Sequence, residues 1–340
     1  MSTPMTFEAL CDRTDLFERS ALMPRPARIR PNVRPTDRRE HEGRREHGQG
    51  QDDAGCPVLD ITQTRVDLAV HPQLPPTPLW AYEGSVPGPT LEVHAGDRVT
   101  VTHRNRIDGV MPVPHVVVDT SLGGSMNLAG SAFASTAPED LDEAAMVSQL
   151  APYTVVHLHG APTPPDSDGQ PEHVIGAGED RLAEYQFPRE TWTVETTAGS
   201  HTVAGGAAPM YWYHDHAMAA TRFNVYAGLA GTVLVRDPVE RHLGLPTDVQ
   251  HEIPLVLMDR GLETADGSAG GMLTGRLLHK VETSVRECFA PVNLVNGQAW
   301  PRCRVTPRVH RLRLVNGSNA RTYRLHFLGQ PDPAQAPVPV

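Results

Sequence analysis

The sequence has few cysteines and few aromatic residues, and it lacks long apolar stretches. It has 4 cysteines in 340 residues and no Cys-X-X-Cys pair, which disfavours a structural zinc site. No apolar run approaches the roughly 20 residues that a membrane helix needs, so we expect no membrane partner. The formal net charge of -10 argues against nucleic acid as the main partner.

The cysteine positions leave two alternatives open. Cys11 and Cys56 lie in polar N-terminal segments, whereas Cys288 and Cys303 follow in the last third of the chain. A disulfide between the latter two is one alternative. Two free thiols are the default, because disulfides are rare in the absence of an export signal.

The frequent chain breakers indicate an all-β protein. The sequence holds 29 glycines and 32 prolines while aromatic residues make up only 5%. Short apolar runs between such breakers are typical of β-sandwiches, and the length suggests two or three domains. Residues 1–55 differ, because they are charged and poor in apolar residues, so we expect a disordered or loosely docked arm. Its Arg-Arg pairs precede no apolar segment, so no export signal is indicated and a cytoplasmic location is expected.

Two His-X-His motifs stand out among the 17 histidines. At this histidine density, roughly one such motif is expected by chance. The motifs here are His157-Leu-His159 after a β-rich run, and His214-Asp-His216 after three aromatic residues. Alternate side chains of a strand project from one face, so each motif aims two imidazoles at one point while Asp215 points away. Neutral imidazole binds copper, zinc, iron and nickel, so the four histidines together predict a metal site.

The flanking residues resemble those of a known family. Thr154–Gly160 followed by Asp166–Gly169 resembles the first copper motif of three-domain multicopper oxidases. Tyr211–Met218 followed by Thr221–Gly228 resembles the second. The similarity is greatest to the subgroup of spore-coat laccase, bilirubin oxidase and phenoxazinone synthase, and it runs from about Trp80 to Phe327.

This resemblance implies cupredoxin-like Greek-key β-sandwich domains, one complete and a second incomplete. Residues 56–237 would form domain 1 and carry both motifs, residues 248–340 would form part of domain 2, and domain 3 would be absent. The third domain of the family supplies a His-Pro-X-His-X-His run and a His-Cys-His run, and neither occurs in this sequence. The type 1 copper site is therefore expected to be absent.

The resemblance also implies roles for single residues. His157 matches the type 2 copper ligand, and His159, His214 and His216 match type 3 ligands, so half of the trinuclear ligand set is present. Asp168 matches an acid that orients water and protons near the copper ions. From the residues alone, it is a turn aspartate before Gly169.

The family activity is copper-dependent oxidation of phenolic or aminophenolic substrates with reduction of dioxygen to water. Dioxygen and a small reducing substrate would be the partners of a full-length parent. The present chain is expected to be inactive alone and to need a missing C-terminal fragment. The alternatives are a non-catalytic copper-binding or copper-sequestering protein and an inert truncated remnant, and the sequence does not name the reducing substrate.

Several further features yield weaker expectations. His94 and His103, on strands around the Ala95–Asp97 turn, are expected at the surface, and that turn is either a hairpin or a corner. His310 and His326 lie beside apolar residues, match no family ligand and stay unassigned. A short helix is expected at Glu139–Leu150, within a long segment of otherwise undefined role.

Overall fold

A computed structural model of the chain describes nine stretches of the sequence. The predicted helix at Glu139–Leu150, Cys11, Cys56 and most of the N-terminal arm lie outside them. The described stretches are residues 5–6, 21–31, 58–113, 152–189, 191–196, 199–204, 208–218, 220–279 and 287–327.

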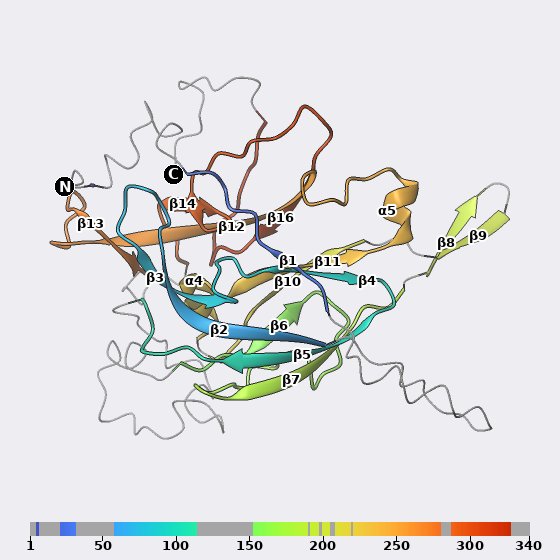
Figure 1. The fold of residues 1–340 in the computed structure, drawn as a ribbon, viewed down its shortest axis with the longest axis horizontal. Helices are drawn as coiled ribbons and strands as arrows, with labels where there is room; N and C mark the ends of the chain where they lie inside the picture. The colour runs from blue at the N-terminus through green and yellow to red at the C-terminus, as the bar shows by residue number, and fades with distance from the viewer. Residues whose placement is uncertain are drawn as a thin grey trace.

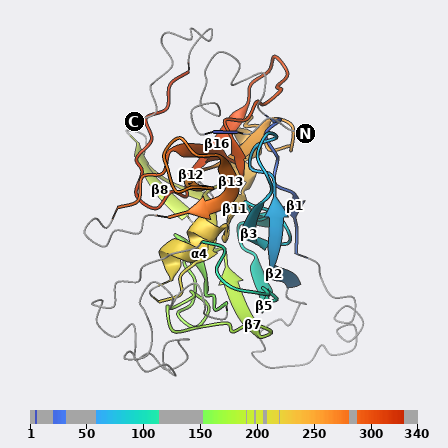
Figure 2. The same cartoon turned by 90° about the vertical axis from the view of Figure 1, so that its left-hand side faces the viewer.

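The first half of the structure is a pair of facing sheets (Figures 1 and 2). One sheet has the order β1-β4-β11-β10-β6 and the other the order β3-β2-β5-β7. Apolar side chains of both sheets form one continuous buried core. The strands of the first sheet are β1 (Arg28–Ile29), β4 (Thr90–His94), β11 (Ala230–Arg236), β10 (Met210–Asp215) and β6 (Val156–His159); those of the second are β3 (Thr77–Tyr82), β2 (Val58–Leu68), β5 (Arg98–Asn105) and β7 (Asp180–Gln186).

The Ala95–Asp97 turn between β4 and β5 is a corner and not a hairpin. β4 pairs with β1 and β11, whereas β5 pairs with β2 and β7, so the chain changes sheets at this turn. Gly96 has φ of +99°, a conformation that glycine adopts without strain. The corner thereby sends the apolar faces of both strands into the same core.

The expectation for His103 was wrong. Val99, Val101, His103 and Asn105 occupy alternate positions of β5, and all four are buried. The period of two therefore places His103 on the apolar face, where its Nε2 lies 2.8 Å from the hydroxyl of Tyr185. Burial lowers the pKa of His103 to about 3, so the ring is neutral. The expectation for His94 is confirmed, because its side chain is 65% exposed.

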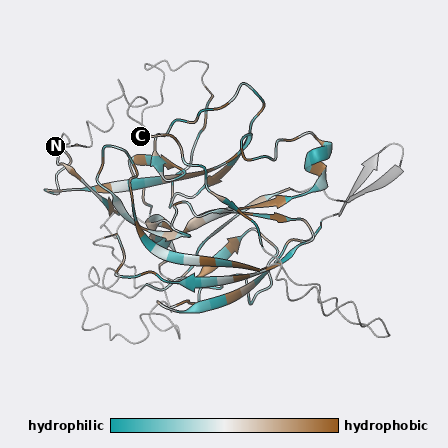
Figure 3. Ribbon diagram, viewed as in Figure 1, coloured by the Kyte–Doolittle hydropathy of each residue, from teal (hydrophilic) through white to brown (hydrophobic). Residues whose placement is uncertain are grey.

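A second sheet unit follows a short linker. The linker contains the short helix α5 (Pro238–His242), whose ribbon is coloured as hydrophilic in Figure 3. The long strand β12 pairs with β13 and β14 antiparallel and with β16 parallel. A turn at residues 295–297 connects β14 to β15. The strands are β12 (Glu252–Thr264), β13 (Leu273–Leu278), β14 (Val292–Val295), β15 (Gln298–Ala299) and β16 (Arg311–Asn316).

Two further elements complete the described fold. Helix α4 (Thr221–Ala227) follows the second histidine motif, and its Phe223 and Tyr226 are buried. The hairpin of β8 (Thr191–Thr196) and β9 (Gly199–Ala204) projects from the main body in Figure 1. Within the described part of the chain, no helix is long and apolar enough to cross a membrane. Cys288 and Cys303 are not joined by a disulfide, which agrees with the default expectation.

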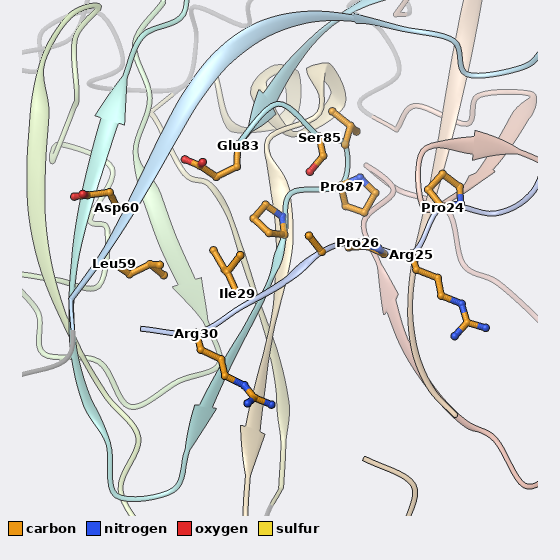
Figure 4. A pocket seen from close by; sticks show the side chains of 13 residues that line it. Pro24, Arg25, Pro26, Ile29, Arg30, Leu59, Asp60, Glu83, Ser85 and Pro87 are labelled. Atoms are coloured by element: carbon orange, nitrogen blue, oxygen red, sulfur yellow. The ribbon is translucent and has the colours of Figure 1, made fainter. Parts of the chain in front are cut away.

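The expectation of a disordered or loosely docked arm was wrong for residues 21–31. Arg28 and Ile29 form β1, which pairs with Thr90 and Leu91 at the edge of the first sheet. The carbonyl of Ala27 also accepts a hydrogen bond from the Thr90 amide at 2.8 Å. Strand pairing thus compensates for the low hydrophobicity of this segment. Between this segment and the loop after β3 lies a pocket of about 520 Å³, with prolines from both segments at its wall (Figure 4).

Buried arginines and glutamates hold the arm, the first sheet and the second sheet unit together. Glu252 opens β12 and accepts from Arg236 of β11 at 2.5 Å and from Arg313 of β16 at 2.8 Å. Glu92 of β4 lies 3.3 Å from Arg28 and 3.4 Å from Arg236. Each carboxylate therefore joins elements that are far apart in sequence, and each buried charge has an opposite charge beside it.

The carboxyl pKa values reflect this pairing. Burial alone would raise the pKa of Glu252, but hydrogen bonds and charge from Arg236 and Arg313 outweigh burial and lower it below its usual value. The same balance lowers the pKa of Glu92, with Arg236 and Arg30 as the cationic neighbours. A depressed carboxyl pKa contributes stability above the unfolded-state value, and this contribution is lost as the pH falls through the folded-state value.

We predict that Glu252→Gln lowers the free energy of unfolding by about 3–5 kcal/mol, because it leaves two buried guanidinium groups without their shared carboxylate. The loss of stability on acidification below pH 4.5, the usual glutamate value, should also be smaller in the variant than in the parent. Urea unfolding at pH 7 and at pH 4 measures both effects. Glu172→Gln is the matched control, since Glu172 is exposed. Equal midpoints for the two variants would contradict this account of the interface.

Candidate metal centre

The two histidine motifs lie on neighbouring strands in antiparallel register. His214 of β10 stands opposite His157 of β6, and Trp212 stands opposite His159. Between them, Tyr213 and Leu158 point the other way and are buried in the core. The strand period of two thus places all the imidazoles of the two strands on the face away from the core.

The four predicted histidines cluster in space, as the sequence predicts. Ligating nitrogens of His157, His159 and His214 all lie within 4.8 Å of one another. His216 comes just after the end of β10, and its ring centroid lies 5.1 Å from that of His157 and 5.9 Å from that of His214. Residues separated by more than fifty positions in the sequence are therefore brought to one point.

The loop after β6 fixes the orientation of His157. Its Nδ1 donates a hydrogen bond to the backbone carbonyl of Asp168, so its Nε2 carries the free lone pair. The Asp168 carboxylate lies 3.6 Å from the same Nδ1. Gly169 permits this approach, because it has φ of +76° and a Cβ there would lie 2.2 Å from the Val156 carbonyl oxygen. Asp168 is therefore adjacent to the cluster, beside His157.

A ring nitrogen of His214 lies next to a ring nitrogen of His159. The Nδ1 of His214 lies 2.7 Å from the carbonyl oxygen of Asp215, which only accepts hydrogen bonds, so this Nδ1 carries the proton. The Nε2 of His214 then presents a lone pair to the Nδ1 of His159 at 3.1 Å. The metal-free arrangement consequently requires His159 to be protonated at Nδ1.

The surroundings of His214 and His159 favour the neutral form of these two imidazoles. Burial, and to a smaller extent the three neighbouring imidazoles, lower the pKa of His214 to about 4, against the hydrogen bond to the Asp215 carbonyl. Burial also lowers the pKa of His159, followed by the charges of His157 and His216. Neutral imidazole is the form that binds metal ions, so these two rings do not need to lose imidazolium protons at neutral pH.

Asp215 points away from the imidazoles, as the strand period predicts. On the opposite side of the strands, its carboxylate forms hydrogen bonds with the backbone next to both motifs. Its carboxylate accepts hydrogen bonds from the amide of Val155 at 2.9 Å and from the amide of Ala217 at 3.0 Å. It also accepts from the side chain of Asn224 in α4 at 2.9 Å. Burial raises the pKa of Asp215 to about 7, and these three hydrogen bonds oppose the rise. This positioning role was not predicted, and an acid between two histidines is the one signal in the sequence that suggests it.

Trp212 is a second residue that the sequence analysis did not assign. Its ring stacks on His214 with centroids 4.0 Å apart and lies 5.4 Å from that of His159. The position two residues before His214 on the same strand is the signal that could have identified it. The indole restricts the ring orientation of His214, which supports a preorganised site.

The residues present fit copper. The cluster offers imidazole nitrogens, which suit copper, and its Asp168 neighbour contacts a histidine as outer carboxylates do in metal sites. The Nδ1 of His216 is buried and has no hydrogen-bond partner among the described residues. Buried polar atoms are rarely left without a partner, so this nitrogen favours a ligand at the cluster. His159 is exposed, so the cluster is accessible from one side.

The fold and the cluster define a β-sandwich protein with a histidine cluster whose donor atoms fit copper, and comparisons with known proteins agree in the family. A family model described as multicopper oxidase matches residues 64–114. A laccase from Bacillus stratosphericus is 36% identical over 277 residues, which are 79% of this chain and 47% of that laccase. A laccase from Bacillus subtilis is 35% identical over 272 residues, which are 78% of this chain and 46% of that laccase.

Solved structures support the same fold. A multi-copper oxidase from Pediococcus acidilactici superposes with a TM-score of 0.57 at 21% identity, covering 88% of this chain and 45% of that one. The chain belongs to the multicopper oxidase family, and its fold is all-β and cupredoxin-like. The chain spans about half the length of the curated relatives it matches.

We predict that Asp215→Ala destabilises the protein by about 3 kcal/mol or more, because it leaves three buried donors without an acceptor. Asp215→Asn should cost about 1–3 kcal/mol, since it keeps one acceptor oxygen. Amide hydrogen exchange should accelerate at Val155 and Ala217 in both variants. Asp67→Ala, at an exposed position of β2, is the control. Unchanged exchange at these two amides in Asp215→Ala would disprove the anchoring role.

Proposed function

We propose that this chain supplies the first half of a trinuclear copper site in a laccase-like oxidase. The observation that carries the proposal is the register of β6 and β10, which gathers the imidazoles of His157, His159 and His214, with the ring of His216 beside them. His157 would hold the type 2 copper, and His159, His214 and His216 would hold the type 3 pair. The resemblance to the family's copper motifs supports this assignment of residues to copper ions.

When bound, copper ions at such a centre supply the one-electron steps by which dioxygen is reduced to water with electrons from a phenolic or aminophenolic substrate. The residues of this chain would orient the histidine ligands and would accept or donate protons. Asp168 holds His157 through its carbonyl, and its carboxylate, 3.6 Å from His157 Nδ1, is placed to accept and deliver protons beside the centre. Trp212 and the Asp215 network keep the rings in place.

The ligand set in these 340 residues is half of what the family reaction uses. A trinuclear centre takes further histidines, and a type 1 site takes a cysteine between histidines, a run that does not occur in this sequence. Missing protein ligands are replaced by water, which reduces affinity and preorganisation. We therefore propose that the chain alone binds copper modestly and does not turn over a phenolic donor.

Oxygen consumption by the purified, copper-loaded chain with a phenolic or aminophenolic donor tests this proposal. We predict no sustained uptake by the 340 residues alone, and uptake after addition of a C-terminal fragment of a related oxidase that carries the missing motifs. The restored uptake should be abolished by His214→Ala and unaffected by His94→Ala, which changes an exposed histidine away from the cluster.

Copper analysis of the same samples separates the alternatives. Copper binding that is weakened by His157→Ala or His216→Ala, with no uptake after addition of the fragment, would favour a copper-sequestering protein. A copper stoichiometry that His157→Ala, His214→Ala and His216→Ala all leave unchanged would show that the cluster binds no ion and would indicate an inert remnant. Sustained uptake by the chain alone that depends on His214 would refute the proposal of half a site.

A further inference from the structure

A second pair of histidines meets far from the first cluster in sequence, at the beginning of the second sheet unit. Strands β12 and β16 run parallel, with Glu252 in register with Arg311. His251 and His310 immediately precede these two residues, and the Arg311 amide donates to the His251 carbonyl at 2.8 Å. Equivalent positions on neighbouring parallel strands carry their side chains to the same side. The two imidazoles consequently meet, with ring centroids 5.3 Å apart.

This spacing matches the spacing inside the first cluster. There, the centroid distances among His157, His159 and His214 are 5.4, 5.5 and 5.3 Å. Two rings at such a separation can share one ion if a nitrogen lone pair of each ring points to the same position. The orientation of each ring therefore decides whether the second pair can also share an ion.

Hydrogen bonds fix both rings at Nδ1. The Nδ1 of His251 lies 2.9 and 3.0 Å from the two carboxylate oxygens of Asp248, and the Nδ1 of His310 lies 2.8 Å from the Arg308 carbonyl oxygen. These oxygens accept hydrogen bonds, so each Nδ1 carries a proton and each Nε2 presents a lone pair. Imidazoles that bind metal ions are almost always held in this way, by a carboxylate or a backbone carbonyl on the other nitrogen.

Asp248 is itself held in place. Its Oδ1 accepts from the amides of Gln250 at 2.9 Å and His251 at 3.1 Å, which forms an Asx turn before β12. The hydrogen bond from the His251 imidazole is the main cause that lowers the pKa of the Asp248 carboxyl. The carboxylate also supplies negative charge behind the ring. The hydroxyl of Thr306 lies 3.4 Å from His251 Nε2 and donates to its lone pair, so an ion bound at this nitrogen replaces that hydrogen bond.

We propose that His251 and His310 form a separate binding site for a divalent first-row transition ion, with Asp248 as a positioning residue. The ligand class follows from the donors, since imidazole nitrogens suit copper, nickel and zinc, and copper binds most tightly in such a series. The site lies on β12 and β16, uses no residue of the first cluster, and does not depend on the oxidase proposal.

Metal binding by the 340-residue chain tests the site, with Cu²⁺ and Ni²⁺ as the probes in equilibrium dialysis. His310→Ala should remove one bound ion, and His214→Ala should remove binding at the first cluster. The two losses should add in the double variant, because the sites share no residue.

His326→Ala changes an exposed histidine of the same part of the chain and should leave the stoichiometry unchanged. His251→Gln provides a second variant, and urea unfolding confirms that each variant is folded.

Pulsed EPR of the Cu²⁺-loaded His214→Ala chain gives a direct readout of the ligands. Two imidazole nitrogens should couple to the copper, and only one should remain in the His214→Ala/His310→Ala double variant. Asp248→Ala should lower the affinity of this ion by about 10–100-fold, with partial recovery in Asp248→Asn, which keeps an acceptor for the His251 Nδ1 proton. Stoichiometry and affinity in His310→Ala equal to those in His326→Ala would overturn the proposal and leave the pair as a structural contact.

Discussion

The register between β6 and β10 is the constraint on which the rest of the site depends. A shift of one residue would move every imidazole of one strand into the core and bring its apolar neighbours to the surface. The register is fixed from both faces. Leu158 and Tyr213 are buried on the core side, and the Tyr213 hydroxyl donates to the Pro89 carbonyl at 2.7 Å. The Asp215 carboxylate accepts one hydrogen bond from the backbone that precedes β6. Burial and hydrogen bonding therefore select one register, and that register determines the metal centre.

The buried charge network has a similar role on a larger scale. Each of its carboxylates contacts guanidinium groups from elements that only the complete fold brings together, such as β11 and β16 at Glu252. Removing one partner would leave a buried charge uncompensated, which is far more costly than the net contribution of the intact pair. The N-terminal segment takes part through Arg28, so its polar composition serves a specific contact. Composition alone indicated disorder because it reports hydrophobicity and not pairing.

The sequence predicted those features that depend on local periodicity. The two His-X-His motifs and the strands around the Ala95–Asp97 turn follow from alternation and turn chemistry. Partners that are distant in the sequence could not be predicted, such as Asn224 for Asp215 or His310 for His251. His103 was expected at the surface because histidine is polar. It lies two residues from Val101 and four from Val99, and this spacing places it on the same buried face of β5. Its partner Tyr185, on β7, compensates for the buried ring nitrogen.

The protonation pattern of the imidazoles offers the most direct test of the copper assignment. In the metal-free chain, His159 must carry its proton on Nδ1 to donate to His214 Nε2, whereas binding an ion through that nitrogen moves the proton to Nε2. Nitrogen-15 NMR of the histidine side chains, recorded without metal and after anaerobic loading with diamagnetic Cu⁺, distinguishes these tautomers. The account predicts that His159 changes tautomer on loading while His157 and His214 keep their Nδ1 protons. Retention of the His159 Nδ1 proton, with metal-induced shifts confined to histidines outside the cluster, would contradict the assignment.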